Sequence, residues 1–140
     1  MIKRAAKSGL FFFSLGLLLV FFLRGSGIQV PSGTWAPSAN MAEVRSGAAS
    51  VLLQDGTILV TGGEGASGVL SSAEFFSAGS FATAPAMNVA RKGHTAVVLQ
   101  DGRVLVAGGK TTGDGVTNAA EVYSPALNSW IVIASMADAR

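Results

Sequence analysis

An arginine and a glutamate recur at matching positions of this sequence and are its most regularly placed charged residues. Arg45 and Arg91 lie 46 residues apart, and Glu74 and Glu121 follow them by 29 and 30 residues. One interpretation is an ion pair in each copy of a repeated unit, which fixes the register of the fold more than it stabilises it. The other is a ligand site, because a guanidinium binds a carboxylate through two parallel hydrogen bonds.

Residues that could build a catalytic or metal site are few. The chain has one histidine, His94, without partners at ligand spacing, and it has no cysteine, which excludes thiolate catalysis and cysteine-ligated metals. Gly63, Gly65 and Gly68 match the dinucleotide-binding fingerprint. That fingerprint requires a helix to begin there, whereas residues 69–77 predict a strand. We therefore expect no catalytic residue, no metal site and no cofactor.

The positive net charge belongs to the first residues of the chain. Residues 1–24 carry four Lys or Arg and no acidic residue, whereas residues 28–140 carry six Lys or Arg against eight Asp or Glu, a net charge of −2. The body has no basic stripe with interleaved aromatic residues, so we expect no nucleic acid as a partner.

An internal repeat organises the body of the chain. Residues 41–63 and 87–109 superimpose with a constant offset of 46, and a methionine stands four residues before each repeated arginine. Both stretches end at a double glycine, which permits a sharp exit of the chain or close packing of a neighbour. These glycines are Gly62 and Gly63 in the first copy, and Gly108 and Gly109 in the second.

Each copy predicts four short strands. The expected strands are residues 48–53, 58–61, 73–77 and a fourth from Phe81 in the first copy, and residues 94–99, 104–107, 120–124 and a fourth from Trp130 in the second. An Asp-Gly pair joins the first two strands of each copy and predicts a two-residue type I′ turn. Polar, Gly-rich loops are expected at residues 64–71 and 110–118, and such loops often contact partners.

The repeat resembles the Kelch motif. The matching marks are the double glycine after an apolar strand, Tyr123 fourteen residues later, Trp130 seven residues further on, and an Arg-x-Gly-His-Thr start at residues 91–95. The first copy has Phe76 and Phe81 in place of the Tyr and Trp. The resemblance covers about residues 33–140 and implies an all-β fold in which each copy is one four-stranded blade of a β-propeller.

The resemblance also implies an incomplete ring, because propellers generally have at least four blades and this sequence holds two with partial edges. The expected parts are residues 28–40 as a linker and N-terminal outer strand that contains Trp35, residues 41–86 and 87–135 as the two repeats, and residues 136–140 as the start of a truncated third. An isolated pair of blades leaves apolar faces exposed. We expect a C-terminally truncated propeller, or self-association through those faces.

Residues 1–27 predict an export signal. Lys3, Arg4 and Lys7 precede residues 9–23, an uncharged apolar run that we expect to form a hydrophobic helix. Its length of about 22 Å is short of a ~30 Å hydrocarbon core, which favours a cleaved signal peptide. The poor cleavage signal favours an uncleaved anchor, with residues 9–23 as the contact with the membrane. In both cases the body lies outside the cytoplasm.

The function that we predict is a non-catalytic, extracytoplasmic scaffold that binds a protein or glycan through its blade loops. The resemblance implies that Arg45 and Arg91 ring the mouth of the propeller channel, where the equivalent positions of ligand-binding Kelch domains can contact acidic ligand groups. The alternative is the N-terminal part of a secreted carbohydrate-active enzyme that resembles galactose oxidase. The copper chemistry of that family needs Tyr and His ligands and a Tyr–Cys crosslink, which one His, one Tyr and no Cys do not supply. A third possibility is a remnant without independent activity.

Overall fold

A computed structural model describes residue 33 and residues 37–140 of the chain. The predicted leader helix and Trp35 lie outside the described residues, and residues 37–40 form no strand. Residues 37–140 form one compact unit. Its regular structure is almost entirely antiparallel β-sheet, as the sequence predicts.

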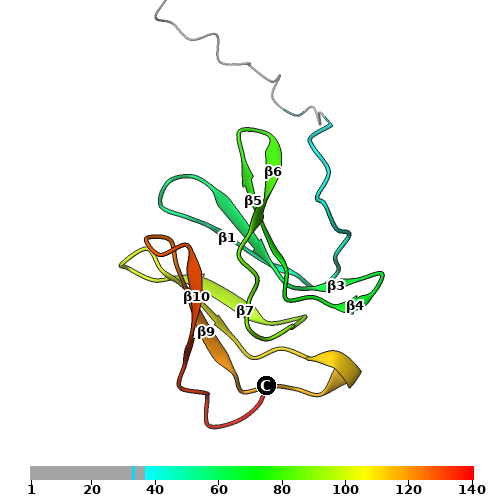
Figure 1. Cartoon of the computed structure of the whole chain (residues 1–140), viewed down its shortest axis with the longest axis vertical. Coiled ribbons are helices and arrows are strands. Elements are labelled where there is room, and N and C mark those ends of the chain that lie inside the picture. Colours follow the sequence, from blue (N-terminus) through cyan, green and yellow to red (C-terminus); the bar gives the residue numbers. More distant parts are fainter. Residues whose placement is uncertain (1–32, 34–36) are drawn as a thin grey trace, which may run out of the picture. The chain divides into compact units, whose positions relative to one another are not determined.

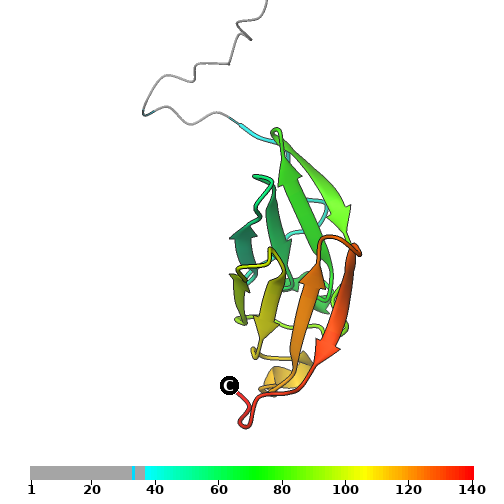
Figure 2. The same ribbon diagram turned by 90° about the vertical axis from the view of Figure 1, so that its left-hand side faces the viewer.

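Two four-stranded sheets lie side by side in this unit (Figures 1 and 2). The first, called blade 1, contains β1 (Ala49–Leu52), β2 (Ile58–Thr61), β5 (Ala73–Ser77) and β6 (Ser80–Ala84) in that order. The second, called blade 2, contains β7 (Thr95–Val98), β8 (Val104–Ala107), β9 (Ala120–Ser124) and β10 (Ser129–Ile133) in that order. Each blade is an antiparallel meander, so the prediction of two four-stranded blades is confirmed.

The loop between the first two strands of each blade differs from the prediction. Leu53 donates its amide to Thr57 O at 2.8 Å, and Gly56 donates to Leu53 O at 3.1 Å, which leaves a three-residue loop in place of the two-residue type I′ turn. In such a loop only the last residue needs positive φ, and Gly56 takes it at +85°. Asp55 therefore avoids positive φ, and its carboxylate accepts the amide of Thr57 at 2.9 Å. Blade 2 repeats this loop, with Gly102 at +84°.

The segment after the first double glycine contains more structure than the loop predicted from its polar, Gly-rich composition. β3 (Glu64–Gly65) and β4 (Gly68–Val69) form a small hairpin there. Glu64 also pairs with Ser46 through two backbone hydrogen bonds, which anchors the hairpin to the entry of blade 1. The corresponding segment of blade 2 contains a short 3-10 helix, η1 (Thr112–Asp114).

The core lies between the two blades. The strand registers place four side chains of blade 1 in one row that points toward blade 2, and four side chains of blade 2 in one row that points back. These rows are Val51, Leu59, Phe75 and Ala82 on blade 1, and Val98, Val104, Tyr123 and Trp130 on blade 2. Leu59 and Val104 are completely buried, and both belong to the core cluster. We call the face of a blade that points toward the preceding blade its front face, and the opposite face its back face.

Residues 136–140 take the same place on blade 2 that residues 87–91 take on blade 1. Gly63 donates its amide to Arg91 O at 2.9 Å, and Gly109 donates its amide to Arg140 O at 2.8 Å. Likewise, Met87 donates to Ser71 O and Met136 donates to Asn118 O, both at 2.9 Å. The backbone therefore begins a third copy of the same arrangement at residue 136.

Candidate functional site

The repeated arginines and glutamates form one buried ion pair in each blade. The Nη2 atom of Arg45 lies 2.7 Å from Oε1 of Glu74, with the side chains 1% and 5% exposed. The Nη2 atom of Arg91 lies 2.9 Å from Oε1 of Glu121, and neither side chain is exposed. Each pair connects the segment before the first strand of a blade to its third strand. From the sequence, these residues were expected to form either an ion pair within each copy or a ligand site.

Further hydrogen bonds hold each guanidinium in place. The Nη1 group of Arg91 donates to Gly108 O at 2.9 Å and to Ala119 O at 2.8 Å. The Nη1 group of Arg45 donates to the equivalent carbonyls, Gly62 O at 2.8 Å and Ser72 O at 3.0 Å. A guanidinium that is buried and bonded to carbonyl groups on one side and a carboxylate on the other has no exposed edge for a ligand. The geometry therefore favours the structural interpretation of Arg45 and Arg91 over ligand binding.

The glutamates accept further hydrogen bonds from the segment that enters each blade. Glu121 accepts from the backbone amides of Asn88 at 2.7 Å and Val89 at 2.9 Å, and from the Asn88 side-chain amide at 2.7 Å. Glu74 accepts from the backbone amide of Ala42 at 2.8 Å. A buried charge is tolerated when it is paired and hydrogen-bonded, and both oxygens of each carboxylate accept at least one hydrogen bond.

The double glycines lie where the chain approaches a neighbour most closely. A Cβ atom on Gly62 would collide with the carbonyl oxygen of Arg91 and lie 2.9 Å from the ring of His94. A Cβ atom on Gly109 would lie 2.8 Å from the carbonyl oxygen of Lys92. Both glycines also have positive φ, +58° and +94°. These glycines therefore have both features that the sequence predicted: a sharp change in the direction of the chain, and a neighbouring segment packed close to the backbone.

His94 joins the two blades as a packed, neutral side chain. Its Nε2 atom lies 2.9 Å from Oγ1 of Thr61 on blade 1, and only 8% of the residue is exposed. Burial, and then the positive charge of Arg91, lower the pKa of His94 from 6.5 to about 4. Its other ring nitrogen, Nδ1, has no hydrogen-bond partner in the part of the chain that the structure describes. His94 is thus a blade-to-blade contact, as expected for a first-strand residue.

The two aromatic marks of the second copy pack between the blades. The ring of Tyr123 lies 6.0 Å from that of Phe75 on blade 1 and 5.4 Å from that of Trp130, and its hydroxyl donates to Asn128 Oδ1 at 2.8 Å. Trp130 donates from Nε1 to Pro85 O at 2.9 Å, which ties it to the segment between the blades. These contacts place Trp130 at the boundary between the blades.

The two loops expected to contact partners are bridged by Lys92. Its Nζ atom lies 2.9 Å from Glu64 Oε2 of β3 and 3.1 Å from Asp114 Oδ1 of η1. Hydrogen bonds to Glu64 and then to Asp114 raise the pKa of Lys92, and the bond to Lys92 lowers the pKa of Asp114. This small charged cluster is exposed and joins one loop of blade 1 to one loop of blade 2.

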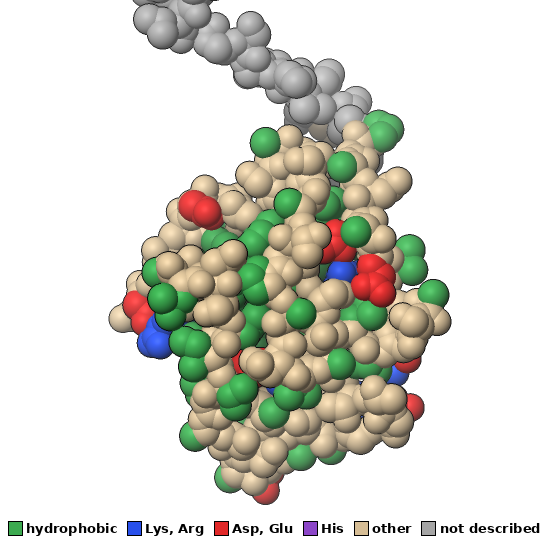
Figure 3. Space-filling model, viewed as in Figure 1, with side chains coloured by type: hydrophobic (Ala, Val, Ile, Leu, Met, Phe, Trp, Pro, Cys, Tyr) green, Lys and Arg blue, Asp and Glu red, His purple; other side chains and the backbone are tan. Residues whose placement is uncertain are grey.

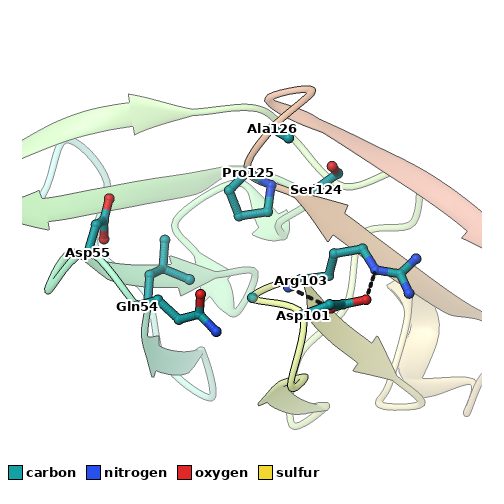
Figure 4. A pocket seen from close by; sticks show the side chains of 9 residues that line it. Gln54, Asp55, Asp101, Arg103, Ser124, Pro125 and Ala126 are labelled. Atoms are coloured by element: carbon teal, nitrogen blue, oxygen red, sulfur yellow. Dashed lines mark hydrogen bonds and ion pairs between the residues drawn. The ribbon is translucent and has the colours of Figure 1, made fainter.

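A groove that the sequence did not predict lies at the hairpin-turn end of the blades (Figure 4). It has a volume of about 320 Å³ and is formed by three turns, two from blade 2 and one from blade 1. Its lining residues are Leu53, Gln54, Asp55, Asp101, Gly102, Arg103, Ser124, Pro125 and Ala126. The repeat held the signal for this groove, because two Asp-Gly turns at the same offset come to the same end of adjacent blades.

The polar side chains of the groove offer hydrogen-bond acceptors and donors that are exposed to solvent. Arg103 Nε lies 2.7 Å from Asp101 Oδ2, with both side chains about half exposed. The backbone amide and then the side chain of Arg103 lower the pKa of Asp101. Gln54 reaches from blade 1 to Gln100 O of blade 2 at 3.3 Å, so the turns contact each other across the blade boundary. The groove therefore combines carboxylate, amide and guanidinium groups from both blades.

The surface around these features carries few charges. On the face seen in Figure 3, hydrophobic side chains lie among uncharged polar surface, and Lys, Arg, Asp and Glu side chains are sparse. Within residues 33 and 37–140, no group of three or more His, Cys, Asp or Glu side chains is placed to hold a metal ion. No helix among the described residues has the length and apolar character needed to cross a membrane.

Comparisons with known proteins assign the blades to a class. Residues 90–137 match the Kelch motif. The structure is similar to that of a fungal alcohol oxidase of the AA5 family solved in complex with copper, with a TM-score of 0.61 and 21% sequence identity over 69% of this chain. The aligned part is 23% of the oxidase, so this chain spans less than a quarter of its length. No curated protein sequence matches the chain.

The fold and these matches identify the described residues as two consecutive blades of the β-propeller type. Residues 90–137, which contain blade 2, carry the Kelch motif, and blade 1 has the same strand order, ion pair and double glycine.

Proposed function

We propose that this chain is an extracytoplasmic, non-catalytic binding scaffold whose Kelch blades hold a protein or glycan ligand. The observation that carries the proposal is the contrast between two sets of polar groups. The repeated Arg and Glu side chains are buried and bonded inside the blades. The groups of the groove between the hairpin turns are exposed and come from both blades.

The chemistry of the groove suits a ligand with many hydroxyl or amide groups. Asp55 and Asp101 offer acceptors, Gln54 offers both a donor and an acceptor, and Arg103 offers donors. Pro125 and Leu53 add apolar surface beside them. Ligand sites in proteins commonly combine a concave, partly apolar wall with a few polar groups that orient the ligand. Because these groups stand on tight turns between strands, the site is held by rigid elements.

A ligand screen of the full chain tests this proposal. The purified chain is screened against a glycan array and a displayed peptide library, and each ligand found is measured again with Gln54→Ala plus Asp55→Ala. Exposed Ser80, whose hydroxyl bonds only within its own turn, supplies the control Ser80→Ala. We expect at least a tenfold loss of affinity in the groove variant and no change in the control. Ligands that bind both variants equally would contradict the proposed site.

Export is the second part of the proposal. It is supported by the sequence of residues 1–27, with three early positive charges before an uncharged apolar run. Fusing the chain to a reporter that is active only after export should give activity, and deleting residues 1–27 should abolish it. Mass spectrometry of the exported body then separates a cleaved signal peptide from an uncleaved anchor. Equal reporter activity with and without residues 1–27 would overturn this part.

The alternative, an N-terminal part of a secreted copper oxidase similar to galactose oxidase, draws its support from the structural likeness. At 21% identity, that likeness concerns the fold. The residues of this chain do not fit a copper site: His94 is buried against Thr61, and Tyr123 bonds to Asn128. The chain also has no cysteine for a Tyr–Cys crosslink. We therefore prefer the binding scaffold.

A further inference from the structure

Among the described residues, two apolar faces of the blades have no partner. On the front face of blade 1, one row across the four strands consists of Leu52, Ile58, Phe76 and Phe81. On the back face of blade 2, one row consists of Val97, Leu105, Val122 and Ile131. Leu52 is 64% exposed, Val97 46% and Ile131 42%, so large apolar side chains of both rows contact solvent. Exposed apolar area that is contiguous marks an interaction surface.

These free faces are the repeat equivalents of the two faces that already form the core. Adding the repeat offset of 46, 47 or 49 residues to the free front row of blade 1 gives Val98, Val104, Tyr123 and Trp130, the buried front row of blade 2. Subtracting the same offset from the free back row of blade 2 gives the back row of blade 1, which packs on the front row of blade 2. These residues are Val51, Leu59, Phe75 and Ala82. The free front face of blade 1 is therefore the repeat equivalent of one half of the core, and the free back face of blade 2 is the repeat equivalent of the other half.

The free front face also has the shape to receive a blade. A shallow groove of about 280 Å³ runs across it, lined by Ile58, Val60, Phe76 and Phe81, with Ser38 and Ser50 at its edge. The rings of Phe76 and Phe81 lie 4.8 Å apart and form one apolar wall of this groove. Phe76 and Phe81 occupy the places of Tyr123 and Trp130, and they lack the polar atoms with which those residues bond to Asn128 and Pro85. An entirely apolar wall needs no specific polar partner from the blade that covers it.

The hydrogen bond between His94 and Thr61 has an apolar counterpart at the free faces. Inside the chain, His94 of blade 2 bonds to Thr61 of blade 1. The repeat equivalents of these two residues are Ala48 and Ala107. A second copy stacked in the same way would place two alanines together where the internal interface has a hydrogen-bonded pair. No buried polar group would be left without a partner at that point.

We propose that copies of this chain associate head to tail, with the back face of blade 2 in one copy packed on the front face of blade 1 in the next. The partner is a second copy, because the internal contact between the blades is already an example of the same pairing. Such an interface is heterologous, so it continues from copy to copy and closes into a ring when the rotation between copies allows it. This inference rests on the blade faces and not on the proposed ligand groove.

Single substitutions that block one face at a time test the direction of the contact. Leu52→Lys places a charge on the front face, and Ile131→Lys places one on the back face. Both side chains are substantially exposed, so the blades should keep their circular dichroism spectrum and their unfolding transition. Leu127→Lys is the matched control, because Leu127 is 67% exposed and lies in the β9–β10 turn, away from both faces.

Sedimentation velocity of the full chain over a range of concentrations gives the expected pattern. The unchanged chain and Leu127→Lys should form species larger than a monomer, and each face variant alone should weaken association at least tenfold. An equal mixture of the two face variants should form dimers, because one open back face and one open front face remain. Val97→Lys replaces Ile131→Lys if that variant does not fold.

Four results would overturn the proposal. The first is an unchanged chain that stays monomeric at all concentrations. The second is association that persists in both face variants, which would assign it to residues 1–36 or to another surface. The third is a mixture of folded face variants that remains monomeric, which would show that the two faces do not bind each other. Survival of association in one face variant alone would indicate like-with-like pairing and would also contradict the head-to-tail contact.

Discussion

Arg91 and Glu121 form an ion pair at 2.9 Å in which neither side chain has any exposed surface. The pair joins the segment that enters blade 2 to the third strand of that blade, 30 residues later in the sequence. Arg45 and Glu74 repeat the arrangement in blade 1. An ion pair of this kind positions the entry segment of each blade, and its removal leaves the surviving charge buried.

Replacing Arg91 with Gln should cost stability through that uncompensated charge. Removing one partner of a buried pair typically costs about 3–5 kcal/mol, because the remaining charge stays away from water. Arg103→Gln is the control, since Arg103 forms an exposed pair with Asp101 and such pairs contribute about 0–1 kcal/mol. Urea unfolding followed by fluorescence measures both. Equal, small effects of the two substitutions would contradict the structural role of Arg91.

Gly62→Ala should destabilise the chain more than Gly79→Ala. Both glycines have positive φ, +58° and +82°, so both substitutions place an alanine in a strained backbone conformation that costs about 1–3 kcal/mol. A Cβ atom on Gly79 meets nothing within 4 Å, whereas a Cβ atom on Gly62 collides with the carbonyl oxygen of Arg91. Because both variants carry the backbone strain, the difference between their thermal unfolding midpoints measures the destabilisation that the collision causes. A Gly62→Ala variant as stable as Gly79→Ala would contradict the close approach of the blades.

The stability of the two blades should fall as the pH decreases from 6.5 toward 4. The pKa of His94 is lowered from 6.5 to about 4, first by burial and then by Arg91, so in this window the unfolded chain binds a proton that the folded chain does not. Stability therefore decreases with decreasing pH, by up to about 3 kcal/mol once the pH is below 4. Above pH 6.5 His94 is neutral in both states and adds no pH dependence.

The variant His94→Gln isolates this contribution. Gln keeps a polar side chain opposite Thr61 and does not titrate, so the difference in unfolding free energy between the variant and the unchanged chain should depend on pH only between about 4 and 6.5. Urea titrations at several pH values measure that difference. A difference that stays constant from pH 7 to pH 4 would show that His94 is not a buried neutral side chain.

Trp130→Phe should remove one hydrogen bond that fixes the blade contact. Trp130 Nε1 donates to Pro85 O at 2.9 Å, and a bond of this type contributes about 1 kcal/mol. Phe keeps most of the apolar ring that packs against Tyr123. A loss of about 1–2 kcal/mol in urea unfolding is expected, since the Pro85 carbonyl is left without its donor. A loss above 4 kcal/mol would mean that ring packing, and not the hydrogen bond, dominates at this site.

Much of the fold could be predicted because the same strand pattern occurs in both copies of the repeat. The third strands, Ala73–Ser77 and Ala120–Ser124, have the predicted bounds, since each is an apolar run that ends at a turn. The first strands are one residue shorter at each end than predicted. The ion pairs were among the predicted alternatives, because Arg and Glu recur together while the residues around them vary.

The features that could not be predicted depend on contacts between distant residues. An Asp-Gly pair fits both a two-residue and a three-residue loop, and the choice is made by the pairing of Leu53 with Thr57. The small hairpin at Glu64 forms because Ser46 offers a backbone partner 18 residues earlier in the chain. The groove between the turns could not be predicted because its shape depends on how the two blades pack together. The sequence of either repeat alone does not give that packing.

Residues 37–140 form two β-propeller blades packed back to front. The contact between Phe75 of blade 1 and Tyr123 of blade 2 tests this packing most directly, because their rings lie 6.0 Å apart and 48 residues separate them. Nuclear Overhauser spectra of the full chain with labelled aromatic residues should show cross-peaks between the Phe75 and Tyr123 ring protons, alongside those between Tyr123 and Trp130. Folded blades that give the Tyr123–Trp130 cross-peaks without those from Phe75 to Tyr123 would contradict the packing of the two blades.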